Sequence, residues 1–191
     1  RRADGERTAR VPKSLHRKRD ARGEPVWPVS GDWVAVDPSD VVVAPLPRLT
    51  RFVRKAAGAK DEVQLVAANI DRALLLMGLD QDFNLRRLER YLALARGSEA
   101  DAVILLTKAS LCGDVPARVE EVRAIARDVP VHALDVLAGT GTEVLSAYLR
   151  RGETVALLGS SGVGKSTLVN FVMGGDVAAT GAVRAGDDRG K

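Results

Sequence analysis

The feature that most constrains this chain is an octapeptide that matches the pattern G-x-x-x-x-G-K-S/T, with Gly159, Gly164, Lys165 and Ser166 at its fixed positions. The apolar run 154–158 precedes it, and residues 165–173 follow it with helical periodicity. A phosphate-binding loop needs this strand-loop-helix context, because the curled backbone and the helix dipole both attract phosphate oxygens. The expected phosphate-binding residues are Gly159, Ser160, Ser161, Gly162, Val163, Gly164, Lys165, Ser166 and Thr167.

Two side chains in this loop have specific expected roles. Lys165 can reach the β and γ phosphates, and the Ser166 hydroxyl can bind a Mg²⁺ ion that bridges them. The alternative is a glycine-rich turn between a strand and a helix that holds a lysine by coincidence. No residue in the sequence is identified as the group that orients an attacking water, so the catalytic residue stays unknown.

The sequence from residue 67 to residue 191 has the texture of an α/β domain, in which apolar strands alternate with helices around a parallel sheet. Asn84 is a candidate N-cap for the first helix, which extends to about Ala95. The expected strands are 73–77, 102–106, 131–134 and 154–158, and the later helices are 117–127, 143–149 and 165–173.

Residues 1–66 differ in character and are expected to form a separate small domain. The first thirty residues are polar and broken by glycine and proline, so regular structure there is doubtful. Short β-like runs follow at 33–36, 41–44, 49–54 and 63–66, which predict a small antiparallel sheet or barrel. Residues 1–60 contain 14 Lys and Arg against 7 Asp and Glu, which indicates either a polyanion-binding module or a solvated basic surface.

Composition narrows the setting of the protein. Cys112 is the single cysteine, so an internal disulfide is excluded and a reducing cytoplasm is expected. No apolar run approaches the roughly 20 residues of a membrane-spanning helix, so no membrane partner is predicted. The chain starts without methionine, which indicates an internal start.

The order of the motifs is unusual. P-loop GTPases read guanine with an N/T-K-x-D loop that follows a later strand, whereas the similar run Thr107-Lys108-Ala109-Ser110 precedes the P-loop here. A circular permutation explains this order, since the ends of a compact α/β domain tend to lie close together.

With this order the chain resembles the circularly permuted ribosome-assembly GTPases known as the RsgA or YjeQ family. The resemblance implies an OB-fold barrel that binds RNA, a permuted GTPase domain, a C-terminal zinc domain and a role in small-subunit maturation. The matching runs are 31–34, 54–58, 67–71, 81–84, 87–92, 159–168 and 180–184.

The resemblance also implies a base site, from which the chain departs. The base-binding candidates are Thr107, Lys108, Ala109, Ser110, Asp135 and Val136. Ser110 stands where the family has an aspartate that accepts two hydrogen bonds from guanine, so weaker discrimination among bases is expected. Asp135 is a new carboxylate nearby, and either takes over part of the base contact or caps the next turn.

Other matching residues allow two interpretations each. Arg48, Arg51, Arg54 and Lys55 are the RNA-binding candidates. Trp33 either stacks on a base or, as is more usual, belongs to the barrel core. Residues 81–84 form a polar turn between a strand and a helix, taken as structural, and residues 187–191 are expected to begin switch I, where the chain stops.

The leading functional hypothesis is a cytoplasmic, monomeric GTPase that uses Mg²⁺ with GTP, binds rRNA and assists maturation of the small ribosomal subunit. Zinc is expected only if a further C-terminal domain exists. The alternatives are an RNA-binding assembly factor that binds nucleotide without turning it over, and a P-loop ATPase or kinase with relaxed base choice.

Overall fold

The structure is a computed structural model that describes residues 7–20, 23, 25–55 and 63–178. The chain divides into two compact units. Unit 1 comprises residues 1–70 with 97–99, and unit 2 comprises residues 71–96 with 100–191. The family-matching run 180–184 and the expected start of switch I at 187–191 lie outside the described residues.

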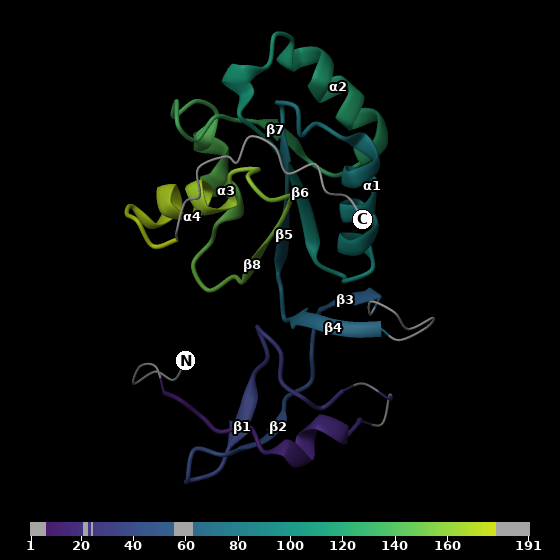
Figure 1. The fold of residues 1–191 in the computed structure, drawn as a ribbon, viewed down its shortest axis with the longest axis vertical. Coiled ribbons are helices and arrows are strands. Elements are labelled where there is room, and N and C mark those ends of the chain that lie inside the picture. The colour runs from purple at the N-terminus through teal and green to yellow at the C-terminus, as the bar shows by residue number, and fades with distance from the viewer. Residues whose placement is uncertain (1–6, 21–22, 24, 56–62, 179–191) are drawn as a thin grey trace. The chain divides into compact units, whose positions relative to one another are not determined.

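The strands of unit 1 form antiparallel pairs, as the sequence predicted. Strand β1 (Val34–Val36) pairs with β2 (Val42–Pro45), and β3 (Arg51–Lys55) pairs with β4 (Val63–Ala68) (Figure 1). The described residues of unit 1 form two separate two-stranded sheets. A 3-10 helix at Lys13–Arg17 buries Leu15, so the first thirty residues contain a structured element that the sequence did not predict.

Two side chains of unit 1 differ from their sequence interpretations. Trp33 was expected in the core, but it lies immediately before β1 and is 65% exposed. Arg48 was an RNA-binding candidate, but only 6% of its side chain is exposed and its guanidinium contacts the Asp32 carboxylate at 2.7 Å. The arginine thus has a structural partner inside unit 1.

Unit 2 is an α/β domain with a parallel sheet, which confirms the predicted fold class for this part. The strands are β5 (Arg72–Gly78), β6 (Asp101–Thr107), β7 (Val131–Ala133) and β8 (Val155–Leu158). They lie in the order β7-β6-β5-β8, and all neighbours are parallel. All seven residues of β5 are buried, as expected of a strand between two parallel neighbours with helices on both faces.

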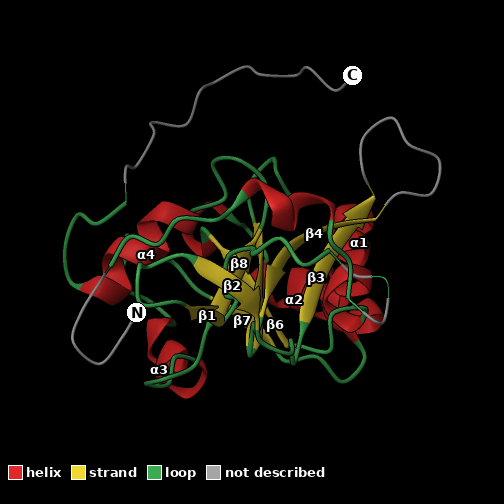
Figure 2. Cartoon of the chain, turned by 90° about the horizontal axis from the view of Figure 1, so that it is seen from below, coloured by secondary structure: helices red, strands yellow, loops and turns green. Residues whose placement is uncertain are grey.

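Helices cover both faces of this sheet (Figures 1 and 2). Helix α1 (Leu85–Arg96) and helix α2 (Val115–Ala126) lie on one side, and α3 (Leu145–Tyr148) and α4 (Lys165–Met173) lie on the other. Alternate residues of the strands serve the two faces: Leu74, Leu76, Val103 and Leu105 pack with Leu145 of α3 and Leu168 of α4.

The helix starts follow from local chemistry. Asn84 caps α1 as predicted, because its side-chain oxygen accepts a hydrogen bond from the Arg87 amide at 3.0 Å. Asp114 caps α2 in the same way and starts that helix two residues earlier than expected. The predicted helix 143–149 is instead a 3-10 turn at Thr142–Val144 followed by the single turn of α3.

Among the described residues, no helix combines the length and the apolar character that crossing a membrane requires.

Candidate nucleotide-binding site

Three loops that are distant in sequence meet at one edge of the unit 2 sheet. The P-loop follows β8, the run 107–110 ends β6, and Asp135 follows β7. Parallel strands end at the same edge, and ligands of open α/β sheets bind there. The Thr107 hydroxyl donates a hydrogen bond to the Val163 carbonyl at 2.7 Å, which joins the expected base loop directly to the expected phosphate loop.

Two positions of the P-loop require glycine, Gly159 for space and Gly164 for its backbone conformation. A Cβ atom at Gly159 would lie 2.8 Å from the Val163 side chain and 3.0 Å from the Leu76 carbonyl oxygen, so the loop must turn close against β5 without a side chain. Gly164 has φ +106° immediately before α4, in the region that L side chains rarely adopt. These two positions fix the curl of the loop and the start of the helix.

Lys165 is the first residue of α4, and its ammonium group lies back over the loop. It donates hydrogen bonds to the carbonyl oxygens of Gly159, at 2.9 Å, and of Ser160. Burial lowers the pKa of Lys165 from 10.5, and the nearby charge of Asp82 opposes that change. The cation is therefore held against the backbone of the loop.

The residues at the start of α4 suit a magnesium ion that is held mainly by nucleotide phosphates. Ser166 and Thr167 lie in the first turn and are partly buried. Within the described part of the chain the Ser166 hydroxyl makes no hydrogen bond, and no cluster of three or more His, Cys, Asp or Glu residues could hold a metal. A single hydroxyl ligand fits Mg²⁺, because this ion usually keeps several waters and takes phosphate oxygens as its other ligands.

The expected first base loop, residues 107–110, is held in a constrained conformation. Lys108 has φ +59°, in the left-handed region, and its ammonium group contacts the Asp80 carboxylate at 2.6 Å. Burial would raise the pKa of Asp80, but the hydrogen bond and charge of Lys108 and the Asp82 amide outweigh it, so the pKa lies below 3.8. The Ala109 amide donates to the Leu134 carbonyl at 3.3 Å, which ties this loop to the end of β7.

The expected second base loop, which contains Asp135 and Val136, is organised by the Asp135 side chain, which connects it to residues 107–110. Asp135 is 6% exposed, and one carboxylate oxygen accepts hydrogen bonds from the Leu137 and Ala138 amides at 3.0 and 3.1 Å. The other oxygen accepts the Ser110 hydroxyl and, at 3.3 Å, the Ser110 amide. Asp135 therefore caps the turn, as one of the two sequence hypotheses held. Val136, next to it, packs against the core of unit 2.

Replacing Asp135 by asparagine should destabilise unit 2 and change its response to acid. The Ser110 hydroxyl and the three amides lower the pKa of Asp135 below 3.8, although burial opposes them. A lowered pKa contributes stability above the unfolded value, and this contribution is lost as pH falls through the folded value. We expect the variant to have a free energy of unfolding about 1 to 3 kcal/mol below that of the parent at pH 7. Between pH 5 and 3 the free energy of unfolding should fall less for the variant than for the parent. Denaturant unfolding across this pH range measures both, and parallel pH curves would contradict the assignment.

The sequence interpretation did not assign three side chains to the site: Asp82, which contacts the P-loop directly, and Asp80 and Arg87, which hold Asp82. The loop 80–84 follows β5, and β5 is the direct neighbour of β8 in the sheet. Asp82 accepts a hydrogen bond from the Ser160 hydroxyl and pairs with Arg87 at 2.6 Å. The match of residues 81–84 and 87–92 to the family was the available signal, but the turn was interpreted as structural because the sequence does not give the strand order that brings it to the P-loop.

The remaining RNA-binding candidates lie on and near β3. Arg51 is partly buried in that strand. Arg54 and Lys55 belong to the same strand, but their side chains lie outside the described residues.

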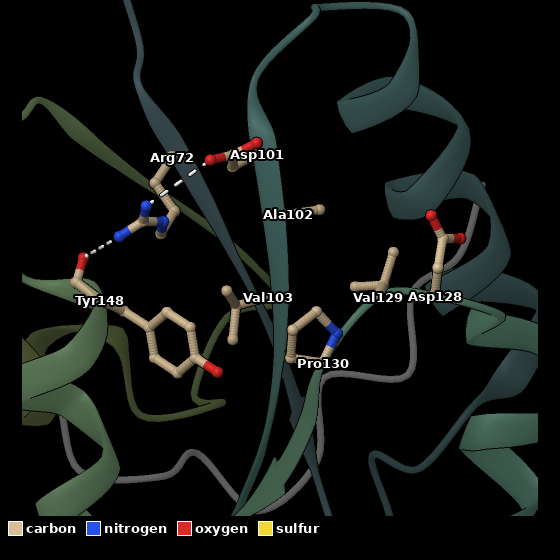
Figure 3. A pocket seen from close by; sticks show the side chains of 8 residues that line it. All are labelled: Arg72, Asp101, Ala102, Val103, Asp128, Val129, Pro130 and Tyr148. Carbon is tan, nitrogen blue, oxygen red and sulfur yellow. Dashed lines mark hydrogen bonds and ion pairs between the residues drawn. The ribbon is translucent and has the colours of Figure 1, made fainter.

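A separate pocket of about 310 Å³ lies at the opposite edge of the same sheet (Figure 3). Arg72 begins β5 there, and its guanidinium is engaged by the Tyr148 carbonyl at 2.9 Å, by Glu153 at 3.2 Å and by Asp101 at 3.6 Å. This pocket lies away from the P-loop, so it is not part of the nucleotide site. Its lining residues are Arg72, Asp101, Ala102, Val103, Asp128, Val129, Pro130 and Tyr148.

Comparisons with known proteins agree with this geometry. Residues 45–191 match the RsgA GTPase family. The small ribosomal subunit biogenesis GTPase RsgA of Opitutus terrae is 45% identical over 177 residues, covering 86% of this chain and 48% of that protein. The protein of the same name from Methanosarcina acetivorans is 47% identical over 169 residues, covering 86% of this chain and 46% of that protein.

Two solved structures share the fold. The crystal structure of YjeQ from Thermotoga maritima aligns with a TM-score of 0.62 and 25% identity, covering 85% of this chain and 55% of that one. YloQ, described as a circularly permuted GTPase, aligns with a TM-score of 0.53 and 22% identity, covering 87% of this chain and 56% of that one. The chain spans about half the length of the curated relatives it matches. The family match over residues 45–191 and the site geometry lead to one conclusion: the chain belongs to the RsgA GTPase family.

Proposed function

We propose that this chain is the nucleotide-binding part of a GTPase that binds rRNA and assists late maturation of the small ribosomal subunit. The observation that carries the proposal is the junction of three loops at one edge of the sheet: the Thr107–Val163 hydrogen bond joins residues 107–110 to the P-loop, and the Ser110–Asp135 hydrogen bonds join them to the loop after β7. The printed names of the relatives, which are small ribosomal subunit biogenesis GTPases, supply the task.

The phosphate site would work by positioning and charge. The backbone amides of residues 159–167 and the Lys165 ammonium would bind the β and γ phosphates, and Ser166 would hold Mg²⁺. Bound Mg²⁺ would neutralise part of the charge that develops on the phosphates. In this reaction class the protein contributes orientation and electrostatic stabilisation rather than a covalent nucleophile.

The test of the proposed function is GTP hydrolysis by the complete protein with and without purified small ribosomal subunits. The proposal expects turnover that rises when subunits are added, because assembly GTPases of this kind act on the subunit. Binding of GTP with no change in rate on addition of subunits would contradict it. Large ribosomal subunits serve as the matched control.

The base site is proposed to read guanine weakly. The base would lie against the first base loop, which consists of Thr107, Lys108, Ala109 and Ser110. Val136 would line the second base loop. The Ser110 hydroxyl donates to Asp135, so only its oxygen lone pairs are left to accept from guanine. The four hydrogen bonds that Asp135 accepts use all its acceptor positions, so Asp135 would act on the base by orienting Ser110.

Exchanging the two side chains should restore strong guanine selectivity. In the double variant Ser110→Asp with Asp135→Ser, the carboxylate would stand in the first base loop and the hydroxyl in the second. Gaining a charged acceptor of about 1.5 to 3 kcal/mol should raise the GTP to ATP affinity ratio by about 10-fold or more. Competition binding with GTP, ITP and ATP measures the ratio. The single variant Asp135→Ala is the control: it removes the partner that orients Ser110 and adds no acceptor, so the ratio should not rise, and a rise as large as that of the double variant would contradict the role given to the carboxylate in the first base loop.

A second candidate function is an RNA-binding assembly factor that uses nucleotide only as a structural ligand. The observation that favours it is the serine at position 110, where the family has a base-reading aspartate, because the Ser110 hydroxyl donates its hydrogen bond to Asp135. Multiple turnover of GTP by the complete protein would exclude this candidate.

Residues 1–66 are proposed to be an OB-fold-like domain that binds RNA, with residues 67–191 as the GTPase domain. The basic charge of the N-terminal part supports RNA binding, because Lys and Arg displace counterions from phosphate backbones. Arg51, Arg54 and Lys55 are the proposed contacts, whereas Arg48 is reserved for Asp32. Trp33, which is exposed, would offer a ring on which a base can stack. The complete protein is proposed to be a cytoplasmic monomer. Zinc would be bound only by a further C-terminal domain.

A further inference from the structure

The Asp82 side chain lies between the start of helix α1 and the P-loop. One carboxylate oxygen contacts Nη2 of Arg87 at 2.6 Å, and the same Nη2 also donates to the backbone oxygen of Asp82. The second carboxylate oxygen accepts the hydroxyl proton of Ser160. The Asp82 amide in turn donates to the Asp80 carboxylate at 3.0 Å. Both the side chain and the backbone of Asp82 are thus held in place.

A carboxylate at this position has an electrostatic cost. It lies near the place where the phosphates would bind, and like charges repel by about 1 kcal/mol at 4 Å even in water, and by more in a partly buried site. Arg87 offsets this charge, and both side chains are 24% exposed. The Nε atom of Arg87 is buried without a hydrogen-bond partner in the described part of the chain. The guanidinium therefore contacts Asp82 through Nη2 while its Nε–H makes no hydrogen bond there.

Ser160 connects Asp82 to the lysine that would bind phosphate. Its hydroxyl donates to Asp82, and its backbone carbonyl accepts from the Lys165 ammonium group. Ser160 is therefore held by Asp82 through its hydroxyl, and it holds the Lys165 ammonium through its carbonyl. The charge of Asp82 also raises the pKa of Lys165 against the effect of burial.

We propose that Asp82 is a positioning residue of the phosphate site: clamped by Arg87, it holds Ser160 so that the Ser160 carbonyl and the Lys165 ammonium are set for a nucleoside triphosphate. This inference rests on the proposed nucleotide binding. It also gives the P-loop a connection to the first turn of α1, since Arg87 belongs to that helix.

The test is nucleotide binding to the complete protein by calorimetry, with GDP and with a non-hydrolysable GTP analogue in the presence of Mg²⁺. Asp82→Ala is expected to bind both nucleotides about 10-fold more weakly, the effect of losing one hydrogen bond to a charged acceptor. Asp82→Asn keeps an oxygen that can accept the Ser160 proton, so it should recover part of the affinity. If Asp82 influenced the phosphates through its charge alone, both variants would bind more tightly, and that result would overturn the proposal.

Ser160→Ala separates positioning from a general loss of structure, because it removes only the hydroxyl. We expect it to weaken binding as Asp82→Ala does, and the double variant Ser160→Ala with Asp82→Ala to be no weaker than either single variant. Additive effects would show that the two residues act independently and would overturn the proposal. Glu120→Ala is the matched control, since it breaks an exposed acid–arginine pair with Arg123 on α2.

Nucleotide binding by the parent protein separates failure of the proposed function from failure of the Asp82 role. If the parent binds no nucleotide, the proposed function fails. If the parent binds and the Asp82→Ala variant, with an unchanged melting temperature, binds equally well, only the positioning role fails.

Discussion

Replacing Lys165 by alanine is expected to lower the affinity for Mg²⁺-GTP by at least about 100-fold. The ammonium group is held at the loop by the carbonyls of Gly159 and Ser160, and exchanging these partners for phosphate oxygens would place it against the β and γ phosphates. Each charge-assisted hydrogen bond contributes about 1.5 to 3 kcal/mol, and two of them correspond to at least 100-fold in affinity. Because burial lowers the pKa of Lys165, the parent protein should also lose affinity at a lower alkaline pH than an ordinary lysine would allow.

Calorimetry on the parent, on Lys165→Ala and on Arg123→Ala measures this effect. Arg123 is an exposed cation that pairs with Glu120 on α2, so its loss tests whether net charge alone weakens binding. A Lys165→Ala variant that melts like the parent and binds GTP within about 3-fold would refute the assignment of the P-loop. A variant that melts much earlier is replaced by Lys165→Met, which keeps the aliphatic part of the side chain.

The secondary structure of unit 2 could be predicted because its signals are local. Helix α4 begins and ends where the sequence placed it, at Lys165 and Met173, because the glycines Gly164 and Gly174 lie immediately outside it. Strand β5 was predicted within one residue at each end, since a fully buried strand is an uninterrupted apolar run. The short helix near residue 145 was less predictable, because one turn carries little periodicity.

The contacts between loops could not be predicted, because they depend on which strands become neighbours. Asp82 meets Ser160 only because β5 and β8 pair, although 78 residues separate the two side chains in the sequence. The capping role of Asp135 was within reach, since aspartate often accepts from amides two and three residues ahead. Its bond to Ser110 required the adjacent ends of β6 and β7.

Unit 1 shows the same division between local and distant information. The strands were readable from short β-branched runs, but the side-chain directions were not. Arg48 was expected on the surface and is buried, whereas Trp33 was expected in the core and is exposed. Composition classes a residue by its usual environment, whereas a buried arginine depends on a distant carboxylate, here Asp32, sixteen residues away.

Replacing Asp32 by alanine is expected to destabilise unit 1 by about 3 to 5 kcal/mol, the cost of leaving a buried arginine without its counter-ion. The Asp32 side chain is 1% exposed and accepts both Nε and Nη2 of Arg48 at 2.7 Å. Arg48 also donates to the carbonyls of Pro25 and Trp27, and Asp32 accepts the Val29 amide, so the pair organises the segment before β1. Such a loss is a large fraction of the 5 to 15 kcal/mol typical of a whole domain.

Tryptophan fluorescence during denaturant unfolding measures this destabilisation selectively, because both tryptophans of the chain, Trp27 and Trp33, lie in unit 1. The double variant Asp32→Leu with Arg48→Met removes both charges and fills similar volume. It should recover much of the loss, since replacing a buried ion pair by packed apolar groups is often neutral. If Asp32→Ala unfolds within about 1 kcal/mol of the parent, the guanidinium reaches water in solution, and Arg48 returns to the set of residues that could contact RNA.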